Sequence, residues 1–181
     1  SLKMIKKNSY KKYFNDISKN LQSFDYTKLE YLRKKIKTQK KNNKIILIGN
    51  GGSASISSHV AVDFTKILKR RAICFNEPNL ITCFANDYGY EQWAKKALEA
   101  YALKGDILIL ISSSGRSKNL INACKFARKK KIFVVTFTGF KKNNPLSKIG
   151  NQNHWVNSSR YNIVEMTHHV WLLSLVDLIS K

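Results

Sequence analysis

The sequence predicts an α/β fold, a three-layer α/β/α sandwich around a five-stranded parallel sheet with an N-terminal helical segment before it. From residue 44 onward, short apolar runs rich in β-branched residues alternate with segments of helical periodicity. This order is typical of buried parallel strands joined by helices. Glycine- or serine-rich turns follow two of the runs. The 181 residues fit a single domain, with helices at 1–43 and an α/β core at 44–181.

The N-terminal segment is charged and carries apolar residues at helical spacing. They recur every three or four positions, at Tyr10, Phe14, Ile17 and Leu21 and again at Leu29, Leu32 and Ile36. We expect two helices within residues 3–40, with a bend near residues 23–26. Asp25 or Thr27 can cap the second helix, because an aspartate or threonine side chain accepts from the first free N–H groups of a helix.

The core alternates strands and helices. Strands are expected at 44–48, 72–75, 107–111, 132–138 and 154–157. Helices are expected at 54–68, 79–101, 118–130 and 162–179, the second of them broken near residues 87–89. Because crossovers between parallel strands are right-handed, this order places helices on both faces of the sheet.

The net charge of +22 comes from 33 basic and 11 acidic residues. Such a charge can indicate a nucleic-acid or membrane partner. However, 27 of the 33 basic residues are lysines, whereas surfaces that recognise bases rely on arginine forks. We therefore do not expect nucleic acid as the main partner, and an anionic small molecule needs only a few of these charges.

The cysteine spacing and the lack of long apolar stretches bear on location. Cys74, Cys83 and Cys124 lie far apart and form no C-x-x-C motif. Their odd number, without an apolar leader, predicts reduced thiols in the cytoplasm. No eighteen consecutive residues are apolar, so we expect no membrane-spanning helix and no membrane partner.

The first candidate ligand loop lies between the strand at 44–48 and the next helix. Its residues are Gly49, Asn50, Gly51, Gly52 and Ser53. Such a loop lies at the carboxyl edge of the sheet, where glycines let backbone N–H groups approach an anion and the helix N-terminus attracts it. A tight turn without ligand is one alternative. A dinucleotide site is another, because Gly49-x-Gly51-x-x-Ala54 fits a variant of that fingerprint.

A second loop favours phosphate over a dinucleotide. Four serines follow the strand at 107–111 and precede another helix: Ser112, Ser113, Ser114 and Ser117. A dinucleotide site has no use for a second cradle of hydroxyl groups, whereas a phosphomonoester fits many neutral donors at a helix N-terminus. Helix-capping serines in a turn remain the simpler alternative.

The motifs GNGGSA at 49–54, His59, Asn86-Asp87-Tyr88-Gly89 and the run at 111–117 together resemble the sugar isomerase (SIS) family, in particular its phosphoheptose isomerase branch. The resemblance extends from about residue 40 to the end of the chain. It implies an aldose–ketose isomerase that converts sedoheptulose 7-phosphate through an enediolate, in a homotetramer with sites between subunits. It also implies that Asp87 contacts the sugar and that five serines hold the phosphate: Ser53, Ser112, Ser113, Ser114 and Ser117.

The family's catalytic pattern is only partly present. It has a His and, four residues later, a Glu on the helix after the glycine loop, and a Gln and a His eight residues apart on the last helix. Together these can bind zinc. This chain has His59 and the shorter Asp63 in the first pair. When the last helix is aligned on Glu165, Val164 and Leu172 take the places of the Gln and the His, and neither can ligate zinc or move a proton.

His168 lies midway between these two positions, in a stripe of four-residue spacing. We therefore expect Asp63 to act as the base and His168, with Glu165, to supply the missing acid or ligand. The pair His168-His169 could instead lie at an interface. Zinc held by His59, Asp63 and His168 is an alternative by resemblance, but acid–base isomerisation requires no cofactor.

The predicted function is a cytoplasmic sugar-phosphate isomerase of the phosphoheptose type, which serves heptose synthesis for surface lipopolysaccharide in a bacterium and forms a homo-oligomer, as a tetramer. One alternative is an isomerase for a different sugar phosphate. Another is a non-catalytic SIS protein that binds sugar phosphates or associates with a replication initiator, since the family includes such a protein and the N-terminal helices here are basic.

Overall fold

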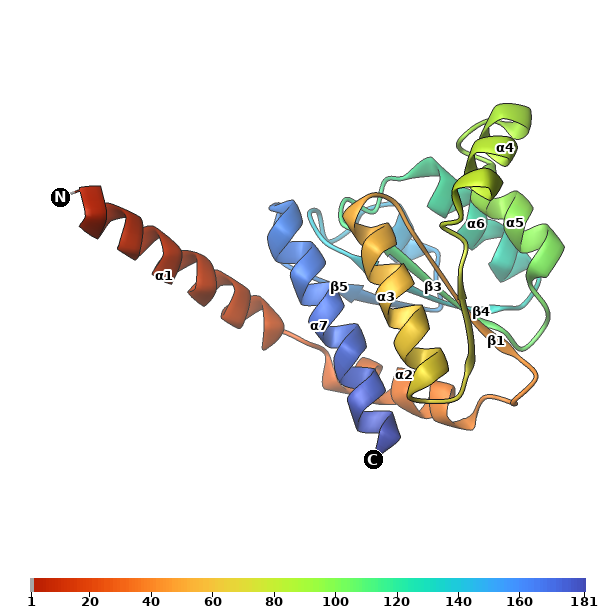
Figure 1. Cartoon of the computed structure of the whole chain (residues 1–181), viewed down its shortest axis with the longest axis horizontal. Coiled ribbons are helices and arrows are strands. Elements are labelled where there is room, and N and C mark those ends of the chain that lie inside the picture. The colour runs from red at the N-terminus through yellow and green to blue at the C-terminus, as the bar shows by residue number, and fades with distance from the viewer. Residues whose placement is uncertain (1) are drawn as a thin grey trace.

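The computed structural model describes residues 2–181, with side chains from residue 8 onward. Within this range five parallel strands form one sheet in the order β2-β1-β3-β4-β5 (Figure 1). The strands are β1 (Lys44–Gly49), β2 (Arg71–Cys74), β3 (Ile107–Ser112), β4 (Phe133–Thr138) and β5 (Gln152–Trp155). The helices are α1 (Leu2–Leu21), α2 (Tyr26–Thr38), α3 (Gly52–Lys66), α4 (Pro78–Tyr88), α5 (Trp93–Tyr101), α6 (Lys118–Lys129) and α7 (Tyr161–Ser180), with a 3₁₀ turn, η1 (Leu146–Lys148).

Helices cover both faces of the sheet, as the sequence predicts. Alternate residues of β1 point to opposite faces: Ile45 and Leu47 pack with α2, α3 and α7, whereas Ile46 and Ile48 pack with α5 and α6. Two of the three inner strands, β1 and β3, are apolar on both sides and almost entirely buried. The predicted three-layer sandwich is therefore confirmed, and the strand order reverses between β1 and β3, where ligands bind in such sheets.

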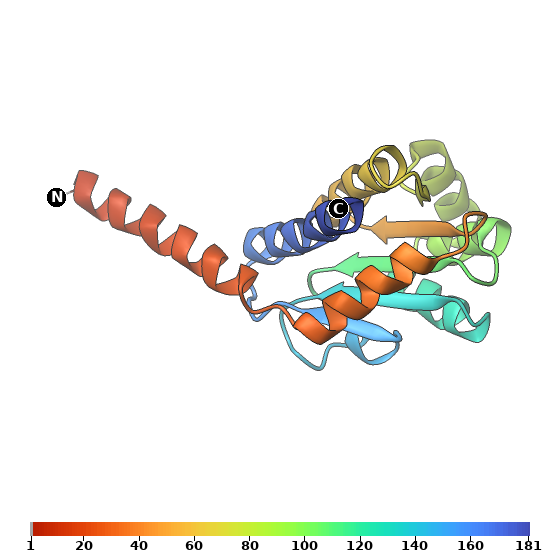
Figure 2. The same ribbon diagram turned by 90° about the horizontal axis from the view of Figure 1, so that it is seen from below.

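The first helix extends away from the sandwich, as two perpendicular views show (Figures 1 and 2). Among the described residues, its contacts with the body come from the last turns: the Trp171 indole donates to the Leu21 carbonyl at 2.9 Å, and Arg160 pairs with Asp16 at 3.3 Å. Tyr10 and Phe14 are 67% and 63% exposed. In proteins most of a helix's stability comes from packing of its apolar face, so this exposed apolar side needs a cover.

The last helix is long and apolar enough to cross a membrane by length and composition alone. In the described structure half of it is buried inside the protein, where Val164, Leu172 and Val176 pack in the core cluster against the sheet. The packing therefore identifies α7 as a core helix of the sandwich.

Several boundaries differ from the predicted ones by one or two residues, and two of the differences have a clear physical reason. The last strand spans Gln152–Trp155 and starts two residues before the predicted position. The polar residues there have partners inside the sheet, since the Asn153 side-chain oxygen accepts from the hydroxyls of Thr136 and Thr138. The predicted break near residues 87–89 is sharper than expected, because Gly89 adopts a φ of 86° and separates α4 from α5.

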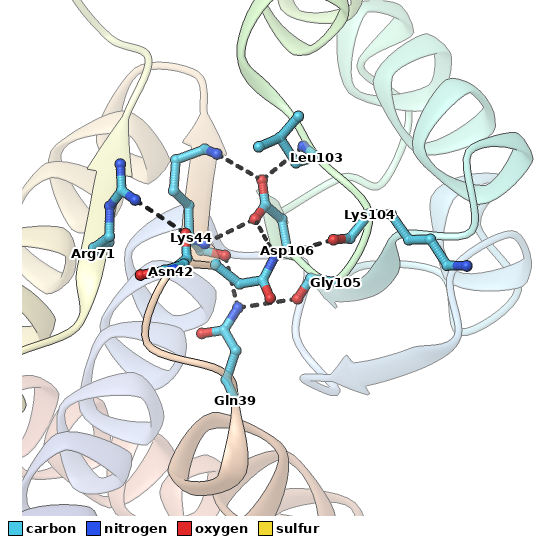
Figure 3. Close-up of polar contacts among 9 residues, drawn as sticks. Gln39, Asn42, Lys44, Arg71, Leu103, Lys104, Gly105 and Asp106 are labelled. Atoms are coloured by element: carbon cyan, nitrogen blue, oxygen red, sulfur yellow. Dashed lines mark hydrogen bonds and ion pairs between the residues drawn. The ribbon is translucent and has the colours of Figure 1, made fainter.

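The amino edge of the sheet is tied together by Asp106, which is 1% exposed (Figure 3). One carboxylate oxygen accepts from the Lys44 N–H at 2.8 Å and from the Asn43 amide at 3.2 Å. The other accepts from the Leu103 N–H at 2.8 Å and pairs with the Lys44 ammonium at 3.0 Å. Burial acts to raise the pKa of Asp106, but these donors outweigh it and hold the pKa below its usual range.

Candidate functional site

The two predicted ligand loops meet at the carboxyl edge of the sheet, after β1 and β3. They share a cavity of about 280 Å³. Ile111, Tyr161 and Glu165 form part of its wall. The rest of the wall consists of all the predicted substrate-binding residues except Asp87: Asn50, Gly51, Gly52, Ser53, Ser112, Ser113, Ser114 and Ser117. This cavity, the serine–glycine cavity, lies at the point where the strand order reverses, so the fold itself positions both loops.

The first loop needs its glycines. Gly51, which caps the N-terminus of α3, adopts a φ of 53°, in the left-handed region that favours glycine. At Gly49 a β-carbon would lie 2.5 Å from the backbone of Ser53, so only glycine lets β1 turn this sharply into the helix. The first N–H groups of α3 consequently border the cavity with the positive end of the helix dipole behind them.

A pair of amides anchors this loop to α6. The Asn50 and Asn119 side chains donate to each other at 3.0 Å in both directions, and the Tyr90 hydroxyl donates to the Asn50 oxygen at 3.0 Å. Asn119 is 2% exposed. Neither Asn119 nor Tyr90 was predicted as part of the site, because they belong to segments distant from the loop in sequence.

The hydroxyl groups of the second loop differ in their hydrogen bonding. The Ser112 hydroxyl accepts from the Gly115 N–H at 3.2 Å, and the Ser114 hydroxyl accepts from the Arg116 N–H at 3.3 Å. The Ser113 hydroxyl is buried and has no hydrogen-bond partner among the described residues. A buried hydroxyl without a partner is uncommon in proteins. Because Ser113 lines the cavity, this unpartnered hydroxyl is a candidate donor to a ligand oxygen.

Glu165 brings a carboxyl group into the same cavity. It extends from α7 toward the start of α3, where it lies against Gly52, and no β-carbon would fit between them. Burial raises the pKa of Glu165. The cavity thus combines neutral donors for an anion with one carboxyl group that can exchange a proton.

His59 and Asp63 lie further along α3 and do not line the cavity. Their side chains are 3.4 Å apart, and the other ring nitrogen of His59 lies 2.8 Å from Nε2 of His169. Burial, followed by the charge of His59, lowers the pKa of His169. No role was predicted for His169, although its position four residues after Glu165 places both on one side of α7.

The structure does not bring His168 to the serine–glycine cavity. His168 is 0% exposed, its Nε2 lies 3.0 Å from the Thr138 carbonyl oxygen, and burial lowers its pKa to about 4. It belongs to the buried stripe of α7 with Val164 and Leu172, which faces the core. We therefore do not retain His168 as an acid or as a metal ligand, because it cannot reach the cavity.

Zinc does not fit the described residues of a single chain. No three His, Cys, Asp or Glu side chains among them are placed to hold a metal ion. The three expected ligands are divided, since His59 and Asp63 lie at the surface of α3 whereas His168 is in the core.

Asp87 also lies outside the cavity. It is exposed at the end of α4, where it accepts from the Asn86 amide at 3.0 Å. Its contact with a sugar therefore remains a prediction.

A family model described as SIS domain matches residues 9–139. The chain belongs to the SIS domain family. A phosphoheptose isomerase from Cytophaga hutchinsonii is 42% identical over 105 residues, 55% of each protein, and one from Thermodesulfovibrio yellowstonii is 38% identical over 119 residues, 62% of this chain and 59% of that protein. The matched part spans a little over half the length of these relatives. A phosphoheptose isomerase from Buchnera aphidicola is 33% identical over 70% of this chain and 71% of its own length. The predicted family is confirmed.

Several solved structures share the fold. Phosphoheptose isomerases from Neisseria gonorrhoeae and Francisella tularensis superimpose with TM-scores of 0.85 and 0.86, at 23% and 24% identity. The superpositions cover 99% and 98% of both chains. The Vibrio vulnificus NanR protein complexed with ManNAc-6P has a TM-score of 0.72 at 20% identity, over 97% of this chain and 61% of that one.

Proposed function

We propose that this protein is an aldose–ketose isomerase that acts on sedoheptulose 7-phosphate through an enediolate. The observation that carries the proposal is the serine–glycine cavity, in which free N–H and hydroxyl donors lie beside a carboxyl group of raised pKa. The names of its curated relatives support the choice of substrate. Heptose synthesis for surface lipopolysaccharide, in the bacterial cytoplasm, is the matching cellular role.

The phosphate would be held by the two loops. The N–H groups of Gly51 and Gly52 approach from α3, and the hydroxyls of Ser53 and Ser113 donate from two sides. These donors are neutral, so the dipoles of α3 and α6 supply the positive potential that a dianion requires. Loop donors fixed by the fold need little reorganisation when the phosphate arrives, and this favours tight binding.

The carboxyl group of Glu165 is our candidate for moving the proton at the carbonyl end of the sugar. Enediolate formation needs a base that removes a C–H proton and an acid that protonates the carbonyl oxygen, and a carboxyl of raised pKa is suited to the acid role near neutral pH. Asp63 follows Ser53 by ten residues on α3, about 15 Å along the helix axis. That separation exceeds the length of a heptulose phosphate, and Asp63 does not line the cavity, so we assign Asp63 to a substrate held by another subunit.

An oligomer would give Asp63 and His59 a role. Both lie at the surface of α3, beside His169 of α7, where a neighbouring copy of this chain can approach. The exposed apolar side of α1 also needs a cover. We therefore propose a homotetramer in which Asp63 of one subunit acts as base on a substrate held by another.

The test is hydrogen exchange in deuterated buffer, with sedoheptulose 7-phosphate and the whole protein. We expect deuterium to enter the carbon next to the carbonyl, and Glu165→Gln to lower the rate by about 10³-fold, within the range that general acid–base catalysis contributes. Ser58→Ala, on the exposed side of α3, is the matched control and should leave the rate unchanged. Absence of exchange in the wild-type protein would contradict the proposal.

A second candidate is binding of a sugar phosphate without catalysis. The observation that favours it is the buried apolar stripe of α7, where Val164 and Leu172 replace residues that the family uses for chemistry. The Vibrio NanR protein, complexed with ManNAc-6P, has the same fold. Thermal stabilisation by sedoheptulose 7-phosphate without any deuterium incorporation would favour this alternative.

A further inference from the structure

We propose that the hollow between α5 and α6 is a second anion site, which binds a compact polyphosphate group of two or more linked phosphoryl units. The hollow measures about 530 Å³. Its lining comes from these two helices and the residues at their ends: Gln92, Lys95, Glu99, Asn122, Lys125, Phe126, Lys129 and Lys130. Both helices cover the face of the sheet opposite α3 and α7, so this lysine hollow is separate from the serine–glycine cavity.

The charges of the lysine hollow are unbalanced. Its one acidic residue, Glu99, is already engaged, with Lys95 at 3.5 Å and Lys96 at 2.9 Å. Among the described residues, Lys125, Lys129 and Lys130 form no ion pair, and all three are exposed. The hollow therefore has an excess of positive charge without a protein counter-ion.

Helix stability does not account for this arrangement. Lys125 and Lys129 are four residues apart on one side of α6, and a like-charged pair at this spacing destabilises a helix. The helix dipole favours cations in the last turn, which explains Lys129, but Lys125 lies before that turn. The Lys130 ammonium is 5.9 Å from the centre of the Phe126 ring, and both residues line the same hollow. An anion in the hollow would relieve the repulsion among them.

The size of the hollow and the type of cation indicate the class of ligand. The volume lies within the range of about 300–1,000 Å³ that is usual for small-molecule pockets. Lysine ammonium groups bind phosphate as point charges, and several together suit neighbouring phosphoryl groups. A free polyphosphate and the phosphate tail of a nucleotide share this chemistry. The ring of Phe126 and the amide of Gln92 could hold a nucleoside in addition.

The experiment measures the melting temperature and calorimetric binding of the full-length protein with inorganic tripolyphosphate and, separately, with ATP, at low salt. We expect saturable binding of tripolyphosphate and a rise in Tm of about 5 °C at one hundred times Kd. The double variant Lys125→Gln/Lys129→Gln should weaken binding at least tenfold. The matched control, Lys37→Gln/Lys41→Gln, removes the same charge at exposed positions near the end of α2 and should bind as the wild type does.

Further variants separate binding in the lysine hollow from binding elsewhere on the protein. Ser113→Ala/Ser114→Ala should retain tripolyphosphate binding, and loss of binding there would overturn the proposal in favour of the serine–glycine cavity. Equal weakening by both lysine pairs would overturn it in favour of diffuse charge, as would binding of an RNA oligonucleotide with none of tripolyphosphate or ATP. If Phe126→Leu weakens ATP but not tripolyphosphate, the site takes a nucleotide; if it weakens neither, the site takes the free polyphosphate. Isomerase exchange should be unchanged in all the lysine variants.

Discussion

Buried polar groups at the two edges of the sheet differ in whether they have hydrogen-bond partners within the protein. At the amino edge, the buried Asp106 carboxylate accepts from four donors and joins the starts of β1 and β3 (Figure 3). At the carboxyl edge of the same strands, the Ser113 hydroxyl is buried without a partner among the described residues and the Glu165 carboxyl has a raised pKa. Polar groups whose partners are internal stabilise the fold, whereas those without partners are available to a ligand.

The largest effect is expected at the amino edge. Asp106→Ala leaves the largely buried Lys44 ammonium and two backbone N–H groups without an acceptor, so the free energy of unfolding should fall by about 3 kcal/mol. Urea denaturation measures this. Affinity for sedoheptulose 7-phosphate, measured at urea concentrations well below the midpoint of unfolding, should be unchanged. A weaker affinity would show that the two edges are coupled.

Two buried histidines in the core between these edges make the stability of the protein depend on pH. Burial lowers the pKa of His154 to about 3 and that of His168 to about 4, whereas both are near 6.5 in the unfolded chain. The unfolded state therefore binds more protons than the folded state between pH 6.5 and 4. The stability that comes from keeping these two histidines neutral is fully present above this window and is lost as the pH falls through it. Each histidine should contribute about 1.4 kcal/mol of loss per pH unit. His168→Gln should flatten the profile, and an unchanged slope would contradict the assignment.

A substitution at Gly51 tests whether the backbone at the carboxyl edge requires glycine. Gly51→Ala forces a side chain into a positive φ and should cost about 1 kcal/mol of stability. It should also lower affinity for the sugar phosphate, because the start of α3 moves. Ser55→Ala, later in α3, is the control for helix stability, and equal melting temperatures for the two variants would contradict the requirement for glycine.

The smallest effect on stability is expected at Ser113. Since its hydroxyl has no internal partner among the described residues, Ser113→Ala should leave the melting temperature unchanged or slightly raised. Affinity for the phosphate should fall about fivefold, as the loss of one hydrogen bond of about 1 kcal/mol implies. Calorimetric titration measures the affinity. A clear drop in stability with intact binding would assign the hydroxyl to the fold instead.

Much of the fold could be predicted because it depends on local patterns. The apolar runs of β1 and β3 are recognisable from composition alone, and a loop after a parallel strand lies at the carboxyl edge whatever its partners are. The start of β5 was misjudged, since its polar residues find partners only across the sheet. Asn119 and Tyr90, which anchor the first loop, could not be predicted because contacts between distant segments leave no trace in one sequence.

Local sequence patterns were sufficient for the α/β/α sandwich, the place of the two loops at the carboxyl edge and the family, because periodicity and the conformational preferences of glycine and serine act over a few residues. They were not sufficient to tell which histidine of the pair on α7 faces outward. His168 and His169 are adjacent, so one turns into the core against Thr138 and the other out toward His59. Their orientation depends on the rotation of α7 against the sheet, which the packing of the whole helix sets.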